Sequence, residues 1–338
     1  MSDIILERFP SDRHRSLVRK SRKAKKSERR SDAIRSETAL DAAWLRAHPL
    51  PPVDDASDKD RRGRVLVAGG AEFVPGALRL TGEAALRAGA GRLQMATVRS
   101  AAMSLGVLVP EAAMIALPAQ EDGEIAASAA ALLIERARRC DMLIMGPGMS
   151  VSAGTDELVA TVLDALEAPL TVLLDAAALT SARALQPIIA RHEGRVILTP
   201  HHGEMAILAD MPPEAVAADP QGVARAMATE FQAVVLLKGR RSIICDPAGQ
   251  CLLYEGSCAG LATGGSGDVL AGVVGGLAAR GAAPRDAAAW ATWVHGQAGQ
   301  RLQDEVGGVG FLARDLLPLI PRILNGISPT GQDQDHRG

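Results

Sequence analysis

The chain has 338 residues, of which 47% are hydrophobic and 22% charged, a balance that excludes an intrinsically disordered protein. Aromatic residues make up only 2%, too few for the stacking platforms that bind single-stranded nucleic acids. The formal net charge of −2 gives no general attraction for polyanions. We therefore expect a folded protein whose partners do not include nucleic acid.

Residues 1–36 differ from the rest of the chain in charge. They contain twelve Lys and Arg against five Asp and Glu, which predicts a solvated, poorly ordered basic tail outside the fold. Residues 37–62 are expected to hold a short helix, over 38–48, and then a Pro- and charge-rich linker. The compact domain is expected to span 63–325, followed by a flexible C-terminus over 326–338.

No apolar segment indicates export or membrane insertion. The N-terminus lacks the apolar core of a signal peptide, and no run approaches the ~18 apolar residues of a membrane span. We expect a cytoplasmic protein with no membrane partner.

The cysteines of the chain, Cys140, Cys245, Cys251 and Cys258, show no zinc-type spacing. We expect them to be reduced, with a Cys245–Cys251 bridge across a hairpin as the alternative.

From residue 63 onward, short apolar runs alternate with helical patterns. Continuous apolar runs predict strands buried on both faces within 64–70, 92–98, 142–148, 170–176, 195–200 and 233–239. Helices are predicted within 76–90, 128–139, 155–167, 220–232 and 284–303, and a hairpin within 242–247 and 251–256. This alternation predicts an α/β fold in which helices sandwich a mostly parallel sheet.

Several of the predicted strands end in glycine or in a polar turn. These turns are Gly69 and Gly70, Gly146 to Gly148, Asp175, Thr199 to His201, and Lys238 with Gly239. Turns in general favour Gly and Pro, but the carboxyl ends of parallel strands share one edge, and ligands bind there in open α/β sheets. We therefore predict a ligand site at this edge.

The stretch "TGGSGD" precedes an apolar helix and predicts an anion site. Gly264, Gly265, Ser266 and Gly267 offer consecutive backbone amides, and the helix adds the positive end of its dipole. Such fixed donors stabilise the charge on a phosphoryl group in transfer. Asp268 is then expected to accept the proton of an attacking hydroxyl; the alternative is that it only caps the helix.

This stretch, extended to "GLATGGSGDVLAGVVGGLAARG", resembles the anion-hole motif of the ribokinase superfamily. Further motifs resemble the NAD(P)H-hydrate dehydratase family in order and spacing: "VLVAGGAEFVPGALRLTGEAALRAGAG", "MGPGMS", "LLDAAALT", "TPHHGEMAIL", "LLKGRRSII" and "GFLARDLLP". The resemblance covers about residues 63–324. The short basic N-terminal segment shows no counterpart of the epimerase domain that some family members carry.

The resemblance implies a ribokinase-like fold and a hydro-lyase that repairs damaged nicotinamide nucleotides. Family members use ADP or ATP, with Mg²⁺, to dehydrate the S form of hydrated NADH or NADPH (NADHX or NADPHX). The ring hydroxyl is phosphorylated and the phosphate then leaves. The resemblance also implies a homotetramer and a separate NAD(P)HX epimerase as functional partner. The single-domain layout favours ADP over ATP.

The resemblance assigns individual residues to the two ligands. Residues expected to contact the hydrated cofactor are Ala77, Gly148, His201 and Asp268. Those expected to border the adenine nucleotide (AMP or ADP) are Lys238, Gly239, Arg240, Arg241, Ser242 and Gly267. Glu204 is the candidate for holding Mg²⁺ through water. Each of these residues also has an ordinary structural interpretation, such as a tight turn at Gly148 or a solvated Lys238 at a strand end.

Three departures from the family pattern leave the acceptor open. Glu72 places an acid in the first glycine-rich turn, and His202 replaces a proline, so that His201 and His202 compete for the substrate contact. Ser257 and Cys258 stand where the family has an Asn-Pro pair. The alternative function is a kinase of a vitamin-precursor alcohol, of the hydroxymethylpyrimidine or hydroxyethylthiazole type. A non-catalytic nucleotide-binding protein is disfavoured by Asp268.

Overall fold

The computed structural model describes residues 38–52 and 62–327. The compact unit begins at Ala39. The predicted basic tail over 1–36 and nearly all of the predicted flexible C-terminus lie outside the described residues, as do residues 53–61 of the predicted linker. These three expectations therefore stay predictions.

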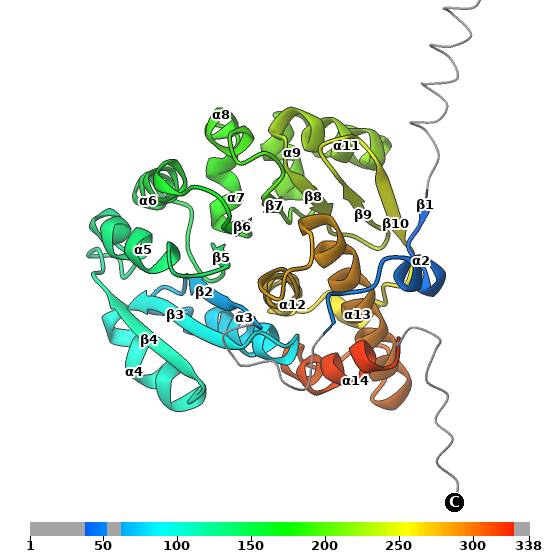
Figure 1. Ribbon diagram of the computed structural model, residues 1–338, viewed down its shortest axis with the longest axis horizontal. Helices are drawn as coiled ribbons and strands as arrows, with labels where there is room; N and C mark the ends of the chain where they lie inside the picture. Colours follow the sequence, from blue (N-terminus) through cyan, green and yellow to red (C-terminus); the bar gives the residue numbers. More distant parts are fainter. Residues whose placement is uncertain (1–37, 53–61, 328–338) are drawn as a thin grey trace, which may run out of the picture. The chain divides into compact units, whose positions relative to one another are not determined.

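A ten-stranded sheet forms the centre of the fold (Figure 1), in the order β1-β10-β9-β8-β7-β6-β5-β2-β3-β4. The strands are β1 Thr38–Ala39, β2 Arg64–Ala68, β3 Arg92–Val98, β4 Ala112–Leu117, β5 Met142–Met145, β6 Thr171–Leu174, β7 Val196–Leu198, β8 Val234–Leu237, β9 Ser242–Cys245 and β10 Cys251–Tyr254. Strands β2 to β8 pair in parallel, whereas β9 and β10 are antiparallel. All six predicted strands and the hairpin are confirmed.

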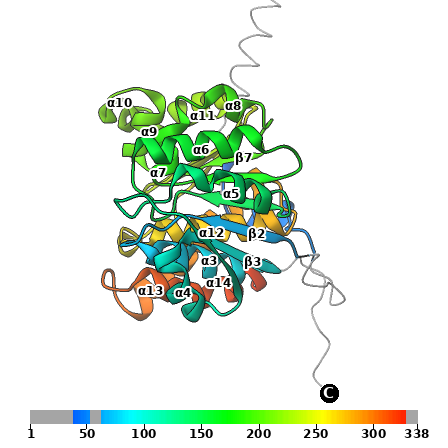
Figure 2. The same ribbon diagram turned by 90° about the vertical axis from the view of Figure 1, so that its left-hand side faces the viewer.

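Helices cover both faces of the sheet (Figure 2). On one face lie α2 Ala42–Ala47, α3 Pro75–Arg87, α12 Ser266–Ala279, α13 Pro284–Glu305 and α14 Ile320–Asn325. On the other lie α5 Ala130–Ala137, α6 Ala153–Ala165, α7 Ala177–Ala182, α8 Gln186–Ala190, α9 His202–Ala209, α10 Pro213–Ala218 and α11 Pro220–Phe231. Helix α4, Arg99–Leu108, packs beside β4. The described part of the chain also has the 3₁₀ segments η1 Ala127–Ala129, η2 Ala259–Leu261 and η3 Ala313–Leu319.

The alternation of side chains along each strand builds two separate cores. Val65 and Val67 of β2 pack into the core with α3 and α12, whereas Leu66 and Ala68 pack into the core with α5 to α11. Successive strand residues point to opposite faces, and both faces are covered. The continuous apolar runs of the sequence reflect this double burial, and the predicted αβα sandwich is confirmed.

The hydrophobic core extends beyond the predicted domain start near Gly63. Leu45 is fully buried, and it packs with Leu40 and Trp44 in the core that α12 and α13 share. The indole N–H of Trp290 donates to the carbonyl of His48 at 2.8 Å. The segment that holds α2 is therefore part of the fold, although the sequence predicted it to precede the domain.

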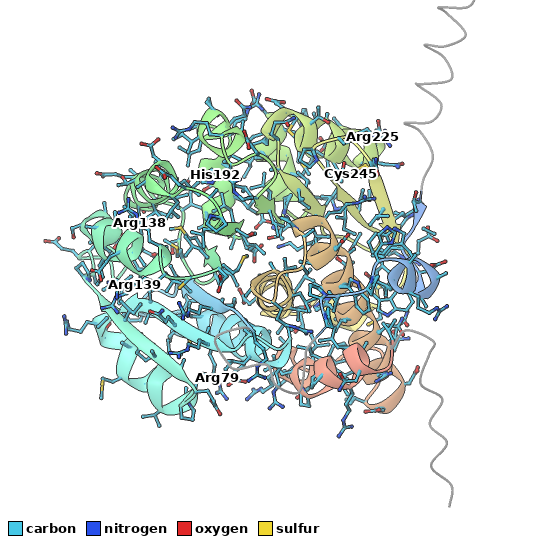
Figure 3. All side chains as sticks on the ribbon, in the orientation of Figure 1. Arg79, Arg138, Arg139, His192, Arg225 and Cys245 are labelled. Atoms are coloured by element: carbon cyan, nitrogen blue, oxygen red, sulfur yellow. A yellow bond between two sulfur atoms is a disulfide. The ribbon has the colours of Figure 1, made fainter. Side chains whose placement is uncertain are left out.

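The cysteine prediction is wrong for one pair. Cys245 and Cys251 form a disulfide, because the hairpin register sets them directly opposite each other with their Cα atoms 4.2 Å apart. Cys245 lies on β9 beneath α11 (Figure 3), and Arg225 of that helix donates to the turn at Gly249. The bridge that the sequence left as an alternative is present, while Cys140 and Cys258 are free.

Candidate active site

The polar strand ends meet at one edge of the sheet, as predicted. Strands β2, β5, β6, β7 and β8 are consecutive parallel neighbours, so their carboxyl ends lie side by side. The alignment continues past the strands, since the amide of Lys238 donates to the carbonyl of Pro200 at 2.7 Å. The edge therefore brings Asp175, His201 and Lys238 together from three different strands.

Helix α12 begins at this edge with the predicted anion-site residues. Its N-cap is Gly265, whose φ of +88° is in the left-handed region that favours glycine. The first amides of a helix have no carbonyl four residues earlier to bond, although here the amide of Ser266 donates to Thr263 at 3.3 Å. The amides of Gly267 and Asp268 follow in the same turn, at the positive end of the helix dipole.

Two glycines of α12 determine how closely it approaches α3. A Cβ atom at Gly272 would lie 2.2 Å from the carbonyl oxygen of Thr81, and one at Gly276 would lie 2.4 Å from that of Ala85. The two helices therefore pack backbone to backbone in a parallel register. One turn earlier, this register places Asp268 at the level of Ala77.

Asp268 is not the cap of its helix. It is the third residue of α12, and the N-cap position has no side-chain hydrogen bond. Burial and, to a smaller extent, charge repulsion from Asp175 raise the pKa of the Asp268 carboxyl to about 7, against the opposing effect of Lys238. A carboxyl with this pKa can take up and release a proton near neutral pH.

Lys238 lies between acidic side chains beside the start of α12. Its Nζ is 2.7 Å from Asp175 Oδ1 and 3.8 Å from Glu204 Oε2, and a Cβ atom at Gly267 would be 3.6 Å from it. Burial alone would lower the pKa of Lys238, but the two carboxylates raise it above its ordinary value. The ammonium group is therefore charged and close to the anion site.

Hydrogen bonds from neighbouring side chains fix the position of the Asp175 carboxylate. Thr199 Oγ1 donates to Asp175 Oδ1 at 2.8 Å, and the carboxylate is almost completely buried, with 3% of the side chain exposed. A buried carboxylate needs such partners to offset desolvation. The sequence placed Asp175 only at a strand end, and its pairing with Lys238 was missed.

The two adjacent histidines have different surroundings. Nδ1 of His201 accepts from the amides of Gly203 and Glu204, and the Glu204 carboxylate accepts from the His201 amide at 2.7 Å, so the pair forms a capping box for α9. The ring of His202 packs against Gly239, where an added Cβ atom would lie 2.8 Å from its Cε1. Of these two histidines, only His201 lines the cavity at the start of α12, called the main cavity below.

A cavity of about 970 Å³ opens at the start of α12. Its lining includes most of the residues predicted to border the nucleotide: Lys238, Gly239, Arg240, Ser242 and Gly267, together with Ser266 of the anion site. Arg241 points elsewhere and pairs with Glu255 at 2.8 Å. Gly264 and Gly265 form the turn before the helix and do not line the cavity. A space of this size accommodates a nucleotide.

The other predicted substrate residues form a second cluster beside α3. Gly148 lies against Ala77, since a Cβ atom at Gly148 would be 3.1 Å from that of Ala77. The loop of Gly148 is joined to the first glycine-rich turn by a hydrogen bond from the Ala71 amide to the Gly148 carbonyl, at 2.9 Å. Glu72, in that same turn, is solvent-exposed and donates its amide to Gly123. The register of α12 on α3 places Asp268 at the level of this cluster.

His295 of α13 also lines the main cavity, and sequence reasoning missed it. Its Nε2 lies 2.9 Å from the hydroxyl of Ser266 and 3.1 Å from the carbonyl oxygen of the same residue. A single histidine in a long helix gives no signal in the sequence, because only the packing of α13 on α12 brings it to the anion site.

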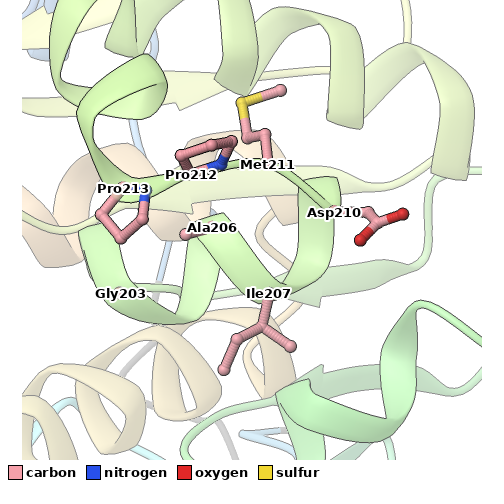
Figure 4. Close-up of a pocket in the computed structure, with 7 residues that line it drawn as sticks. All are labelled: Gly203, Ala206, Ile207, Asp210, Met211, Pro212 and Pro213. Atoms are coloured by element: carbon pink, nitrogen blue, oxygen red, sulfur yellow. The ribbon is translucent and has the colours of Figure 1, made fainter.

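A second hollow of about 460 Å³ lies on the outer side of α9 (Figure 4). It is lined by Gly203, Ala206, Ile207, Asp210, Met211, Pro212 and Pro213. The carboxylate of Asp210 points away from the two prolines in the view of Figure 4, and the remaining side chains are apolar. This hollow lacks the converging polar groups of the main cavity.

The described residues contain neither a cluster of metal-binding side chains nor a membrane-spanning helix. Within residues 38–52 and 62–327, no group of three or more His, Cys, Asp or Glu side chains is arranged to hold a metal ion. None of the helices in these same ranges is long and apolar enough to cross a membrane.

Comparison with known proteins identifies relatives over most of the chain. A family model described as NAD(P)H-hydrate dehydratase matches residues 65–322. The chain is 45% identical over 285 residues to the ADP-dependent (S)-NAD(P)H-hydrate dehydratase of Xanthomonas campestris, covering 84% of this chain and 95% of the relative. Bifunctional NAD(P)H-hydrate repair enzymes also match, although the chain spans about half of their length.

Solved structures share the fold. The ADP/ATP-dependent NAD(P)H-hydrate dehydratase from Bacillus subtilis, co-crystallised with ATP and Mg²⁺, superposes with a TM-score of 0.73 at 28% identity, covering 87% of this chain and 100% of that one. A ribokinase-like superfamily protein from Enterococcus faecalis gives 0.72 at 24% identity, over 87% of this chain and 97% of its own. The predicted ribokinase-like fold is therefore confirmed.

Proposed function

The chain belongs to the NAD(P)H-hydrate dehydratase family, and from this premise we propose that it dehydrates the S form of NADHX or NADPHX to NADH or NADPH at the expense of ADP or ATP. The observation that carries the proposal is the position of Asp268, whose carboxyl has a pKa of about 7 in the first turn of α12. A base and an anion site are thereby combined in one helical turn.

The proposed reaction begins as a phosphoryl transfer. Asp268 accepts the proton of the ring hydroxyl while the hydroxyl oxygen attacks the terminal phosphorus of the nucleotide. The bond from that phosphorus to its bridging oxygen breaks, and with ADP as donor AMP leaves. The amides of Gly267 and Asp268, at the positive end of the helix dipole, stabilise the charge on the transferring group.

The second step of the proposed reaction is an elimination. The bond between the ring carbon and oxygen breaks, a proton leaves the neighbouring ring carbon, and inorganic phosphate departs with the former hydroxyl oxygen. Because phosphate is a much better leaving group than hydroxide, the first step makes this elimination easy. The overall reaction consumes NADHX and ADP and yields NADH, AMP and phosphate.

We assign the nucleotide to the 970 Å³ cavity. Arg240 and Ser242 would border the adenosine part, and Lys238 would meet the phosphates as a point charge. Lys238 already lies at the start of α12 and is held there by Asp175. The hydrated nicotinamide would enter from the side of Ala77 and Gly148, with His201 at the border between the two ligands. We favour ADP as donor because the X. campestris relative is described as ADP-dependent.

Glu204 is the candidate to hold Mg²⁺ beside this cavity: it is not among the lining residues, but its Oε2 lies 3.8 Å from the ammonium group of Lys238, which is one of them. Phosphate-bound Mg²⁺ keeps several waters and needs few carboxylates, so the lack of a three-ligand cluster among the described residues agrees with such a site. When bound, the ion would neutralise charge on the nucleotide phosphates.

Three further features remain part of the proposal. We place the enzyme in the cytoplasm, expect a homotetramer, and expect a separate epimerase to supply the S form of the substrate. The kinase alternative, with a hydroxymethylpyrimidine or hydroxyethylthiazole acceptor, would use the same anion site and base. It is disfavoured because the relatives that match most of this chain are dehydratases and repair enzymes.

The test is to incubate the protein with hydrated NADH and ADP, or ATP, and to follow the return of dihydronicotinamide absorbance. We expect recovery with the wild type, and a loss of about 100-fold or more with Asp268→Asn, because the amide keeps the shape of the carboxyl but cannot accept the proton. Calorimetry should show that Asp268→Asn still binds ADP. No recovery with either nucleotide, together with phosphorylation of a pyrimidine alcohol, would establish the kinase alternative instead.

A further inference from the structure

His295 makes the only side-chain contact from α13 to the anion site among the hydrogen bonds of the described residues. One ring nitrogen, Nε2, is 3.1 Å from the carbonyl oxygen of Ser266 and 2.9 Å from its hydroxyl. Ser266 is the first residue of α12 and is itself almost fully buried, with 4% exposed. The contact therefore reaches the turn whose amides would hold the phosphoryl group.

The chemistry of these partners determines the protonation of the ring. A carbonyl oxygen only accepts hydrogen bonds, so Nε2 must carry a hydrogen and donate it. Burial and the charge of Lys238 lower the pKa of His295 to about 4, against the opposing effect of the Ser266 carbonyl. At neutral pH the ring is an uncharged donor with a defined tautomer.

The helix that carries His295 is fixed closely against the hairpin. A Cβ atom at the next residue, Gly296, would lie 2.2 Å from the hydroxyl of Tyr254, and one at Gly299 would lie 2.6 Å from Leu261. The ring of Tyr254 also meets Trp293 edge-on at 5.8 Å. This packing leaves α13 little room to shift, so its side chains can act as fixed supports.

We propose that His295 is a positioning residue that holds Ser266, and with it the first turn of α12, in the geometry that phosphoryl transfer requires. The proposal rests on the proposed function, since it concerns the same anion site. Fixed donors stabilise a transition state only when they are already oriented toward the charge that develops. His295 acts through Ser266 and supplies no proton to the reaction.

Three variants test this role. His295→Leu removes the donor, His295→Gln keeps an N–H donor on a side chain of similar reach, and Thr292→Val is the matched control. Thr292 lies one turn earlier on the same helix, is buried, and donates only to Ala288 of its own helix. The readouts are kcat for NADH recovery at saturating ADP, the Kd for ADP by calorimetry, and the melting temperature.

We expect His295→Leu to lower kcat by about 10- to 100-fold, somewhat less than the loss of a whole anion-hole donor, with the Kd for ADP nearly unchanged. His295→Gln should recover most of the rate, and Thr292→Val should match the wild type. If His295→Leu fails to fold, His295→Asn takes its place, because its shorter side chain keeps an N–H donor but cannot reach Ser266. A folded His295→Asn with the kcat of His295→Gln would make His295 a purely structural residue.

Several outcomes would overturn the role of His295. A wild-type kcat in His295→Leu would show that the anion site needs no support from α13. A large rise in the Kd for ADP with unchanged kcat at saturation would make His295 a nucleotide contact instead. These results differ from a failure of the proposed function, in which the wild-type protein itself would recover no NADH.

Discussion

The groups around Asp268 have opposing effects on the ionisation of its carboxyl. Burial and the neighbouring Asp175 favour its neutral form, while Lys238 favours the carboxylate. Asp175 also pairs directly with Lys238 at 2.7 Å, so these three groups form one electrostatic unit. The balance brings the pKa of Asp268 to about 7, close to the value at which a general base is most effective at neutral pH.

The raised pKa of Asp268 also costs stability. Below about pH 4 the carboxyl is protonated in both the folded and the unfolded chain, and between about pH 4 and 7 only the unfolded chain ionises. The folded protein therefore loses up to about 4 kcal/mol of stability as the pH rises from about 4 to 7. We predict that Asp268→Asn is more stable than the wild type at pH 8, and that the gain disappears near pH 4.

Denaturant unfolding at several pH values measures this difference. Asp286→Asn is the matched control, since Asp286 holds the same third position in α13 that Asp268 holds in α12. That control should show no gain at pH 8, because it only loses a favourable interaction with the helix dipole. Equal stability of Asp268→Asn and wild type at pH 8 would mean that the Asp268 carboxyl ionises in the folded protein without cost.

The sequence predicted the site residues that follow from local pattern. Asp268 was identified because glycines and a helix start stand directly beside it in the chain. The partnership of Lys238 with Asp175 joins residues 63 positions apart, and that of His295 with Ser266 joins residues 29 apart. Such contacts depend on how strands and helices pack, so no local pattern could predict them. The placement of Arg241 outside the cavity is a difference of the same kind.

At the scale of elements, the start of α12 is positioned by its packing on α3. The close approach at Gly272 and Gly276 leaves no room for side chains between the two backbones. The end of α12 that carries the anion site is therefore fixed by contacts one and two turns away. The glycines of "AGVVGG" thus serve the packing of the helix, while those before Ser266 serve the turn.

We predict that Gly272→Ala destabilises the protein by about 1–3 kcal/mol, since overpacking a close contact forces the backbones apart. The added Cβ atom would lie 2.2 Å from the Thr81 carbonyl oxygen, and the strain would outweigh the helix propensity gained, about 1 kcal/mol. The rate of NADH recovery should also fall, because the added strain would shift the first turn of α12. Thermal and denaturant unfolding, with the rate at a permissive temperature, measure both effects.

Gly76→Ala is the control for this prediction. Gly76 lies in the partner helix α3, and nothing is within 4 Å of an added Cβ atom there. The same substitution should therefore be neutral or slightly stabilising. A Gly272→Ala variant as stable as Gly76→Ala would show that α12 and α3 can separate without cost.

Several of the elements that the sequence missed have weak local patterns. The edge strand β4, "AAMIAL", is rich in alanine, which is depleted in strands, and it is only partly buried. The helices α7, α8 and α10 have five or six residues each, too few for a clear helical period. The buried central strands, in contrast, were all predicted because both of their faces are covered.

At the scale of the whole molecule, the fold brings the two proposed ligand regions to the start of the same helix. The cavity with Lys238 and Ser266 lies on the side of α13, and Ala77 with Gly148 lies on the side of α3. The register of α12 on α3 places Asp268 at the level of Ala77. This arrangement suits a reaction in which a group passes from one bound molecule to another.

The central claim is that the substrate hydroxyl attacks phosphorus before it leaves the ring. The most direct measurement uses hydrated NADH whose ring hydroxyl carries ¹⁸O, and follows the label by mass spectrometry after turnover with ADP. Our account predicts that the ¹⁸O appears in inorganic phosphate, together with NADH and AMP. Recovery of NADH with the ¹⁸O in water and unlabelled phosphate would contradict it, because dehydration would then proceed without a phosphorylated intermediate.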